Sequence, residues 1–160
     1  MNIIGIDPGY DRVGIAVLEK NGGKETLLYS SCFQTSKDAD VNDRINDFIN
    51  ELQKIIKEYS AAELSIENLF FQNNQKTAMR VAESRGAIIN TAKQAGLTVH
   101  EYTPLQIKQA VTGYGRADKG QVHTMVKQLV TLEDRKYIDD EIDAIATALT
   151  HSASRKILSL

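Results

Sequence analysis

Two carboxylates that directly follow short apolar segments are the side chains of this chain best placed to do chemistry. Asp7 follows the apolar residues 3–6, and Glu67 follows residues 64–66. Short runs rich in Ile, Val and Leu are typical of buried strands. Pro8 and Gly9 predict a turn immediately after the first acid. We therefore expect both acids at the carboxyl edge of an α/β sheet, where such proteins bind ligands.

A second pair of carboxylates, Asp140 and Asp143, lies near the start of a helical segment close to the C-terminus. Residues three apart on a helix project about 60° from one another, so both can reach one ion, or an ion and its water. Acids are also common in first turns for electrostatic reasons alone. On the helical wheel these acids share a side with the small Ala144 and Thr147, which would let this face pack tightly against strand ends.

Four acids from distant segments, directed at one point, are the donor set of a divalent-metal site for phosphodiester cleavage. Mg²⁺ prefers oxygen ligands. Two such ions about 3.5–4 Å apart can hold both the attacking and the leaving oxygen of an in-line displacement. Four carboxylates would neutralise two ions, with Mn²⁺ able to substitute. The single cysteine, Cys32, and the scattered His100, His123 and His151 indicate surface or satisfied side chains rather than a zinc site or a disulfide.

Asp7 by itself also fits the phosphate loop of actin-like ATPases, because Gly9 and Gly14 would let a loop pass close to a phosphate or a metal. Those enzymes need two lobes around a nucleotide. A chain of 160 residues is too short for two lobes, so we expect no nucleotide binding.

Size and composition are those of an ordinary globular protein, with 42 % hydrophobic and 25 % charged residues. Residues 1–160 are expected to form one domain in the cytoplasm, because no apolar run approaches the ~20 residues of a membrane span and no signal peptide is evident. The net charge is -2, yet residues 76–136 hold ten Lys and Arg against five acids. This local excess fits a polyanion-binding surface and a merely solvated surface equally well.

The periodicity along the chain predicts an α/β protein with a mixed sheet covered by helices. Asn21-Gly22-Gly23 predicts a hairpin between the second and third strands. Apolar residues between Ile45 and Tyr59 recur at helical spacing, in a segment that begins at Val41. The other expected elements are strands at 3–7, 14–18, 26–33, 62–67 and 97–102, and helices at 74–95, 104–111, 118–130 and 140–154.

Small side chains recur on one stripe of the long helix expected at 74–95, at Ala78, Ala82 and Gly86. Such a stripe lets another backbone approach closely. The stripe fits packing on the chain's own sheet and pairing of two subunits equally well.

Taken together, these motifs resemble the RuvC family of bacterial crossover (Holliday) junction endodeoxyribonucleases along nearly the whole chain. Their order and spacing carry the resemblance, since each alone is weak. The matching stretches are Ile4 to Gly9, Ile66-Glu67 with Phe70, Ala82 to Gly86, Glu101 to Val111, Lys119 with Gln121-Val122, and Asp140 to His151.

The resemblance implies an RNase H-like fold, with a mixed five-stranded sheet flanked by helices. It implies that Asp7, Glu67, Asp140 and Asp143 are catalytic acids that bind Mg²⁺, two ions in each active site. Lys108 and Lys119 would contact DNA near the scissile phosphate, with Lys119 in the catalytic set. Phe70 would meet unpaired bases at the crossover, although an aromatic residue after a strand is more often a core anchor, and Lys119 could be only a solvated charge beside a helix cap.

The resemblance also implies a homodimer with two active sites. Such a dimer nicks two strands of like polarity across a four-way DNA junction, prefers certain thymine-containing sites, leaves 5′-phosphate and 3′-hydroxyl ends, and acts with the branch-migration proteins RuvA and RuvB. Two alternatives stay open: an RNase H-like nuclease that processes ribosomal RNA precursors, and a junction-binding protein without catalysis. Departures from the family pattern, Asn68, Phe71 and a short, weakly basic tail, bear on cleavage preference.

Overall fold

The structure is a computed structural model that describes residues 1–68 and 75–158. In chain order its elements are β1 (Asn2–Asp7), β2 (Arg12–Asn21), β3 (Lys24–Gln34), α1 (Val41–Glu58), β4 (Glu63–Glu67), α2 (Gln75–Gln94), β5 (Thr98–Tyr102), α3 (Pro104–Thr112), α4 (Lys119–Leu129) and α5 (Asp139–Leu158). Within the described ranges, no helix is long and apolar enough to cross a membrane.

The five strands form one mixed sheet in the order β3-β2-β1-β4-β5. β1, β2 and β3 form an antiparallel meander, and Gly22 and Gly23 adopt positive φ angles of 57° and 91° at the predicted hairpin between β2 and β3. β4 and β5 add to the other edge in parallel with β1. The α/β prediction with a mixed five-stranded sheet is confirmed. Parallel neighbours end at the same edge of a sheet, so the ends of β1 and β4 lie side by side.

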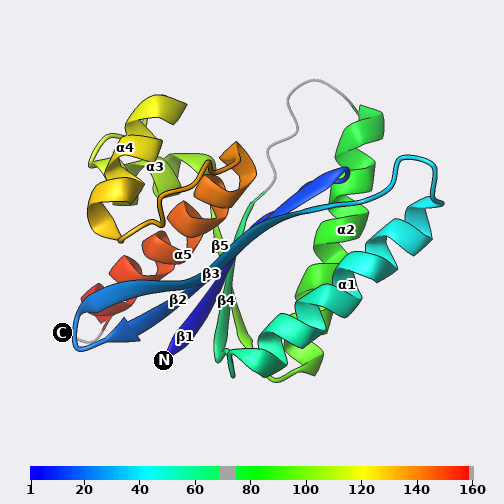
Figure 1. Cartoon of the computed structure of the whole chain (residues 1–160), viewed down its shortest axis with the longest axis horizontal. Coiled ribbons are helices and arrows are strands. Elements are labelled where there is room, and N and C mark those ends of the chain that lie inside the picture. Colours follow the sequence, from blue (N-terminus) through cyan, green and yellow to red (C-terminus); the bar gives the residue numbers. More distant parts are fainter. Residues whose placement is uncertain (69–74, 159–160) are drawn as a thin grey trace.

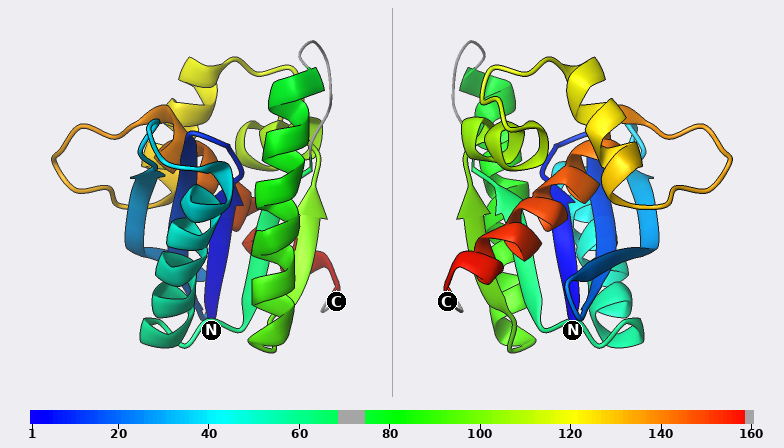
Figure 2. Two further views of the ribbon diagram at one scale, coloured as in Figure 1. Left: turned by 90° about the vertical axis from the view of Figure 1, so that its right-hand side faces the viewer. Right: turned by 90° about the vertical axis from the view of Figure 1, so that its left-hand side faces the viewer.

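Helices cover both faces of the sheet (Figures 1 and 2). α1 and α2 pack on one face over a cluster that includes Phe48, Leu52 and Ile88. α5 lies directly on the other face, against β1 and β2, with α3 and α4 packed outside it. Residues 144–152 of α5 are all buried. The helix face with Ala144 and Thr147 therefore packs tightly against the sheet, as predicted.

Two boundaries differ from the sequence prediction in ways that matter for the site. The second strand begins at Arg12 rather than at 14, so Gly14 lies inside β2 and pairs with Asp7. The proposal that Gly14 belongs to a loop near a phosphate is therefore wrong. The last helix extends from Asp139 to Leu158, beyond the predicted 140–154.

Candidate active site

Asp7 and Glu67 occupy the final positions of two neighbouring parallel strands, β1 and β4. The register pairs Ile6 with Ile66, the residues immediately before the two acids. The strands bring the acids together because each apolar segment is buried in the sheet and ends at the same edge. The expected carboxylate pair at the carboxyl edge is therefore present.

Two glycines let α5 lie against the sheet without intervening side chains. A Cβ atom at Gly5 would lie 2.2 Å from the carbonyl oxygen of Ala144, and one at Gly14 would lie 1.9 Å from the carbonyl oxygen of Asp140. Any other residue would push the helix away. The close approach brings the first turn of α5, with Asp140 and Asp143, next to the end of β1. The Cβ position at Gly14 is also 3.2 Å from the Cβ of Asp7.

Like charges crowd this corner of the molecule. Burial, reinforced by the carboxylates of Asp143, Glu67 and Asp140, raises the pKa of Asp7 to about 8. Burial and the charge of Asp143 raise the pKa of Glu67 to about 7. Burial also raises the pKa of Asp143 above its ordinary value. Asp7 thus interacts with each of the other three acids, and Asp143 also interacts with Glu67, so the site favours added positive charge.

The four side chains offer oxygen atoms that the rest of the described structure leaves unused. None of its hydrogen bonds or ion pairs involves the carboxylates of Asp7, Glu67 or Asp143. Oδ2 of Asp140 is buried without a hydrogen bond and faces the guanidinium of Arg12 at 3.2 Å. These converging carboxylates, of which only Asp140 has an ion-pair partner among the described residues, form a donor set that suits Mg²⁺ or Mn²⁺.

Both predicted lysines lie at the same place. Lys108 of α3 and Lys119 of α4 line a cavity of about 250 Å³ together with Glu67 and Asp143. The charges of both lysines lower the pKa values of these two acids, against the effect of burial. Lys119 is 75 % exposed, and its Nζ lies 3.7 Å from Asp139. The cavity thus joins carboxylates to the half-buried Lys108 and the exposed Lys119, as a site for a metal-bound phosphate would require.

The start of α4 is fixed by a capping box. The Asp118 side chain accepts a hydrogen bond from the backbone N–H of Gln121, whose side chain accepts one from the Asp118 N–H. This arrangement satisfies helix N–H groups that would otherwise lack partners. It leaves Lys119, the first residue of the helix, beside the carboxylates.

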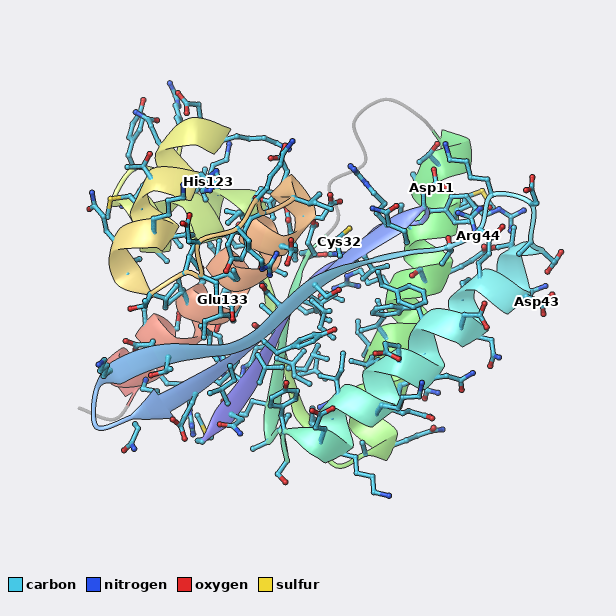
Figure 3. All side chains as sticks on the ribbon, in the orientation of Figure 1. Asp11, Cys32, Asp43, Arg44, His123 and Glu133 are labelled. Carbon is cyan, nitrogen blue, oxygen red and sulfur yellow. The ribbon has the colours of Figure 1, made fainter. Side chains whose placement is uncertain are left out.

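Two arginines that the sequence reasoning did not single out hold the site in place. Arg85 of α2 donates from Nε to the carbonyl oxygen of Glu67 at 3.2 Å and pairs with Glu101 of β5. Arg44 of α1 is buried and pairs with Asp11 at 2.5 Å, both labelled in Figure 3. Arg44 also lies over the ring of Tyr10. The two residues fix the end of β4 and the loop after Asp7.

Comparison with known proteins agrees with this geometry. Residues 3–151 match the family model described as "Crossover junction endodeoxyribonuclease RuvC". The chain belongs to the RuvC family. The RuvC protein of Petrotoga mobilis is 43 % identical over 156 residues, which cover 98 % of this chain and 96 % of that protein. The RuvC protein of Thermosipho melanesiensis is 44 % identical over 148 residues, 92 % of this chain and 94 % of that protein.

The RuvC fold is also found among solved structures. The chain resembles the structure of Thermus thermophilus RuvC in complex with Holliday junction substrate, with a TM-score of 0.92 and 29 % identity over 99 % of this chain and 97 % of that one. The predicted resemblance to RuvC and the RNase H-like fold are thus confirmed.

Predictions from the sequence also concern Phe70 and the three histidines. Phe70 lies outside the described residues, together with Phe71. Both ring nitrogens of His151 have a hydrogen-bond partner, so this histidine is satisfied, as predicted. The rings of His100 and His151 stack with centroids 4.0 Å apart, because β5 and α5 meet on one face of the sheet. His123 lies on α4 (Figure 3), and its Nε2 is buried without a hydrogen bond.

The replacement Asp7→Asn should stabilise the metal-free RuvC chain, and the gain should grow with pH. The folded-state pKa of Asp7, about 8, lies above its ordinary value of 3.8. Between these values the unfolded chain binds fewer protons, so wild-type stability falls as pH rises. Asparagine does not ionise. We expect the variant and the wild type to differ least in their free energy of unfolding near pH 3.8, the ordinary pKa of Asp7. At a pH above the raised pKa the variant should be more stable by about 1–2 kcal/mol, or about 2–8 °C in Tm.

Thermal unfolding in EDTA across this pH range measures the effect. A difference that does not change with pH, or a variant less stable than the wild type in alkaline buffer, would contradict the crowding of charge at Asp7. The matched control is Asp47→Asn on the exposed side of α1, which should leave the pH profile unchanged.

Proposed function

We propose that this chain is a metal-dependent endodeoxyribonuclease that resolves four-way DNA junctions by paired, symmetric nicks, in recombination and DNA repair. The observation that carries the proposal is the convergence of Asp7, Glu67, Asp140 and Asp143 beside two lysines, in a member of the RuvC family. The likeness to a RuvC bound to Holliday junction substrate supports the choice of substrate.

In this proposal the four acids hold two Mg²⁺ ions in each active site. When bound, these ions lower the pKa of an attacking water and stabilise the departing 3′ oxygen, which leaves 5′-phosphate and 3′-hydroxyl ends. The carboxylates supply the negative charge that fixes the ions. The burial that raises their pKa values also excludes water from the back of the site. Lys119 and Lys108 then bind the phosphate oxygens at the open side of the cavity.

DNA would lie across the connection between α3 and α4. Lys119 and Arg116 are exposed there, and Tyr114 is 57 % exposed beside them. Positive side chains neutralise backbone phosphates, and an exposed aromatic ring offers a surface for an unpaired base. Phe70, in the segment after β4, is proposed to meet unpaired bases in the same way.

We further propose that two copies pair through α2. Ser84 and Ile88 of this helix are buried on the sheet, whereas Ala82 and Gly86 face outward. A Cβ atom at Gly86 would have open space around it, and Met79 on the same stripe is 66 % exposed. Packing on the chain's own sheet therefore does not account for these two small residues. A second α2 could approach closely along them. In cells the dimer would act with RuvA and RuvB.

Gly86→Glu should convert the dimer to a monomer, because a charged side chain would separate two closely packed helices and bury an unpaired carboxylate. Light scattering at micromolar concentration measures the mass. Asn50→Glu, an exposed change on α1, is the control and should stay dimeric. Wild-type protein that is monomeric at this concentration would contradict pairing through α2.

Cleavage of a synthetic mobile four-way junction, with and without Mg²⁺, tests the function. We expect symmetric nicks in two strands of like polarity, only with the metal, and little cutting of linear duplex. Preferential cutting of linear duplex would overturn the junction assignment. Cutting of a structured ribosomal RNA precursor instead would favour the RNA-processing alternative. Tight junction binding without any cutting would favour the non-catalytic one.

A further inference from the structure

A second group of metal-ligating side chains lies away from the four acids. Glu63 of β4, His100 of β5 and His151 of α5 each offer one ligand atom, and these atoms all lie within 4.8 Å of one another. Glu63 precedes Glu67 by four strand residues, about 13 Å. His151 follows Asp143 by eight helical residues, about 12 Å. Figures 1 and 2 show the C-terminal end of α5 near the N-terminus of the chain, at the end of the sheet opposite the carboxyl ends of β1 and β4. The two groups are therefore separate sites.

Each ring nitrogen of His151 has a hydrogen-bond partner in the structure. The residue is 1 % exposed, with Nε2 2.6 Å from Oε2 of Glu63 and Nδ1 2.7 Å from the hydroxyl of Tyr102. Burial lowers the pKa of His151 below its ordinary value, which favours the neutral ring. In the neutral ring with the proton on Nε2, that N–H donates to Glu63 and the Tyr102 hydroxyl donates to Nδ1. Neutral imidazole is the form that binds metals.

The other two members complete the group. Glu63 is 8 % exposed, and its second oxygen, Oε1, lies 3.3 Å from Arg155. The pairing with Arg155 leaves Oε2 for His151 or for a metal. His100 stacks on His151 at 4.0 Å between ring centroids and is half-buried. An ion could therefore enter from the side of His100.

We propose that Glu63, His100 and His151 bind one Zn²⁺ ion or a similar transition-metal ion, at a site distinct from the catalytic carboxylates. Two imidazoles and one carboxylate form a ligand set that zinc takes in proteins, with a fourth position left for water. Mg²⁺ instead prefers oxygen ligands. The two sites thus select different metals by the chemistry of their donors.

Binding requires the His100 ring to turn out of its stack on His151 and involves no net loss of a proton from His151. Zinc bonds of about 2.0–2.1 Å in a tetrahedron place ligand atoms about 3.3 Å apart, so Glu63 and Nε2 separate slightly from 2.6 Å and the His100 ring moves inward. The proton of His151 moves from Nε2 to Nδ1, where the N–H donates a hydrogen bond to the Tyr102 oxygen, and the Tyr102 hydroxyl turns its own proton away from the ring. A hydrogen bond from the second nitrogen orients a histidine ligand and strengthens it.

The ion would join α5 to β4 and β5, two strands that are already paired in the sheet. α5 would be tied to β4 and β5 at one end, while Asp140 and Asp143 lie at its other end. Because the ion binds the folded chain alone, zinc should raise the unfolding temperature. The site is thus structural, and it holds in place the helix that carries two catalytic acids.

Zinc titration of tag-free, chelator-stripped protein in excess Mg²⁺ tests the proposal, with a chromophoric zinc chelator as competitor. We expect one Zn²⁺ per chain in the wild type and in Asp7→Asn. His100→Gln should weaken binding by more than about 100-fold, and Tyr102→Phe by about 10–100-fold, as for other outer partners of a ligand histidine. Co²⁺ should give the visible absorption of a tetrahedral site in the wild type and in Asp7→Asn, but not in His100→Gln.

The half-buried position of His100 makes His100→Gln a change that the fold should tolerate, and its metal-free unfolding temperature verifies this. Wild-type protein that takes up no zinc under competition would overturn the proposal. Zinc binding that survives His100→Gln and is lost in Asp7→Asn would assign the ion to the acids instead. Junction cleavage by His100→Gln in Mg²⁺ should be unchanged, so a failure of the nuclease proposal would be seen separately.

Discussion

Asp7→Asn should reduce junction cleavage in Mg²⁺ by on the order of 10³-fold or more while leaving junction binding in EDTA at the wild-type level. Asp7 lies at the centre of the cluster, because the charges of Asp143, Glu67 and Asp140 all act on it. Asparagine keeps the shape but removes a charged ligand. Metal-ion catalysis contributes several kcal/mol of transition-state stabilisation, and each 1.36 kcal/mol is tenfold in rate.

Cleavage under single-turnover conditions separates this effect from product release, and a gel-shift assay in EDTA measures binding. Asp139→Asn is the matched control. Asp139 is adjacent to Asp140 but is 72 % exposed and paired only with Lys119 among the described ion pairs, so the change should cost little. An Asp7→Asn variant that cuts at the wild-type rate would refute the assignment of the metal site. Equal losses in both variants would show that only the local charge matters.

Gly14→Ala should reduce the rate of cleavage by on the order of 10²-fold, although it adds a single methyl group. The new Cβ would lie 1.9 Å from the carbonyl oxygen of Asp140, far inside van der Waals contact. The first turn of α5 must therefore move away from β2, and Asp140 and Asp143 move with it. Overpacking of this kind costs about 1–3 kcal/mol in stability, and a displacement of about 1 Å at a catalytic group can cost 10²-fold in rate.

Rate, unfolding temperature and Mg²⁺-induced stabilisation should be measured together for this variant. Ser36→Thr is the control, because it also adds one methyl group, but on an exposed side chain away from the site and from α2. We expect Gly14→Ala to remain folded, with a lower Tm and little response to Mg²⁺. A variant with wild-type Mg²⁺ response and rate would show that the close contact between β2 and α5 does not position the acids.

Local pattern alone predicted the strand ends and the helix start that carry the four acids. The apolar run before Asp7 and the one before Glu67 each end at an acid, and burial in a shared sheet brings such ends together. The helical spacing likewise predicted that the face of α5 with Asp140, Asp143, Ala144 and Thr147 packs against strand ends. These features depend on the sequence near each residue, so periodicity predicts them.

Contacts between distant elements were not predictable in this way. The spacing indicated that position 14 needs a small residue, but it did not reveal which group lies against it. That group is the backbone of Asp140 rather than a phosphate. Arg85 reaches the carbonyl of Glu67 only because α2 crosses behind β4. His100 and His151 appeared unrelated because the register of β5 and the path of α5 together decide their contact.

Anomalous scattering from crystals soaked in Mn²⁺ tests most directly whether the four carboxylates share metal ions. We predict Mn²⁺ peaks between Asp7, Glu67, Asp140 and Asp143, at about 2 Å from carboxylate oxygens, and their loss in crystals of Asp7→Asn. Crystals with no Mn²⁺ among these four side chains, or with Mn²⁺ only at Glu63, His100 and His151, would contradict the account.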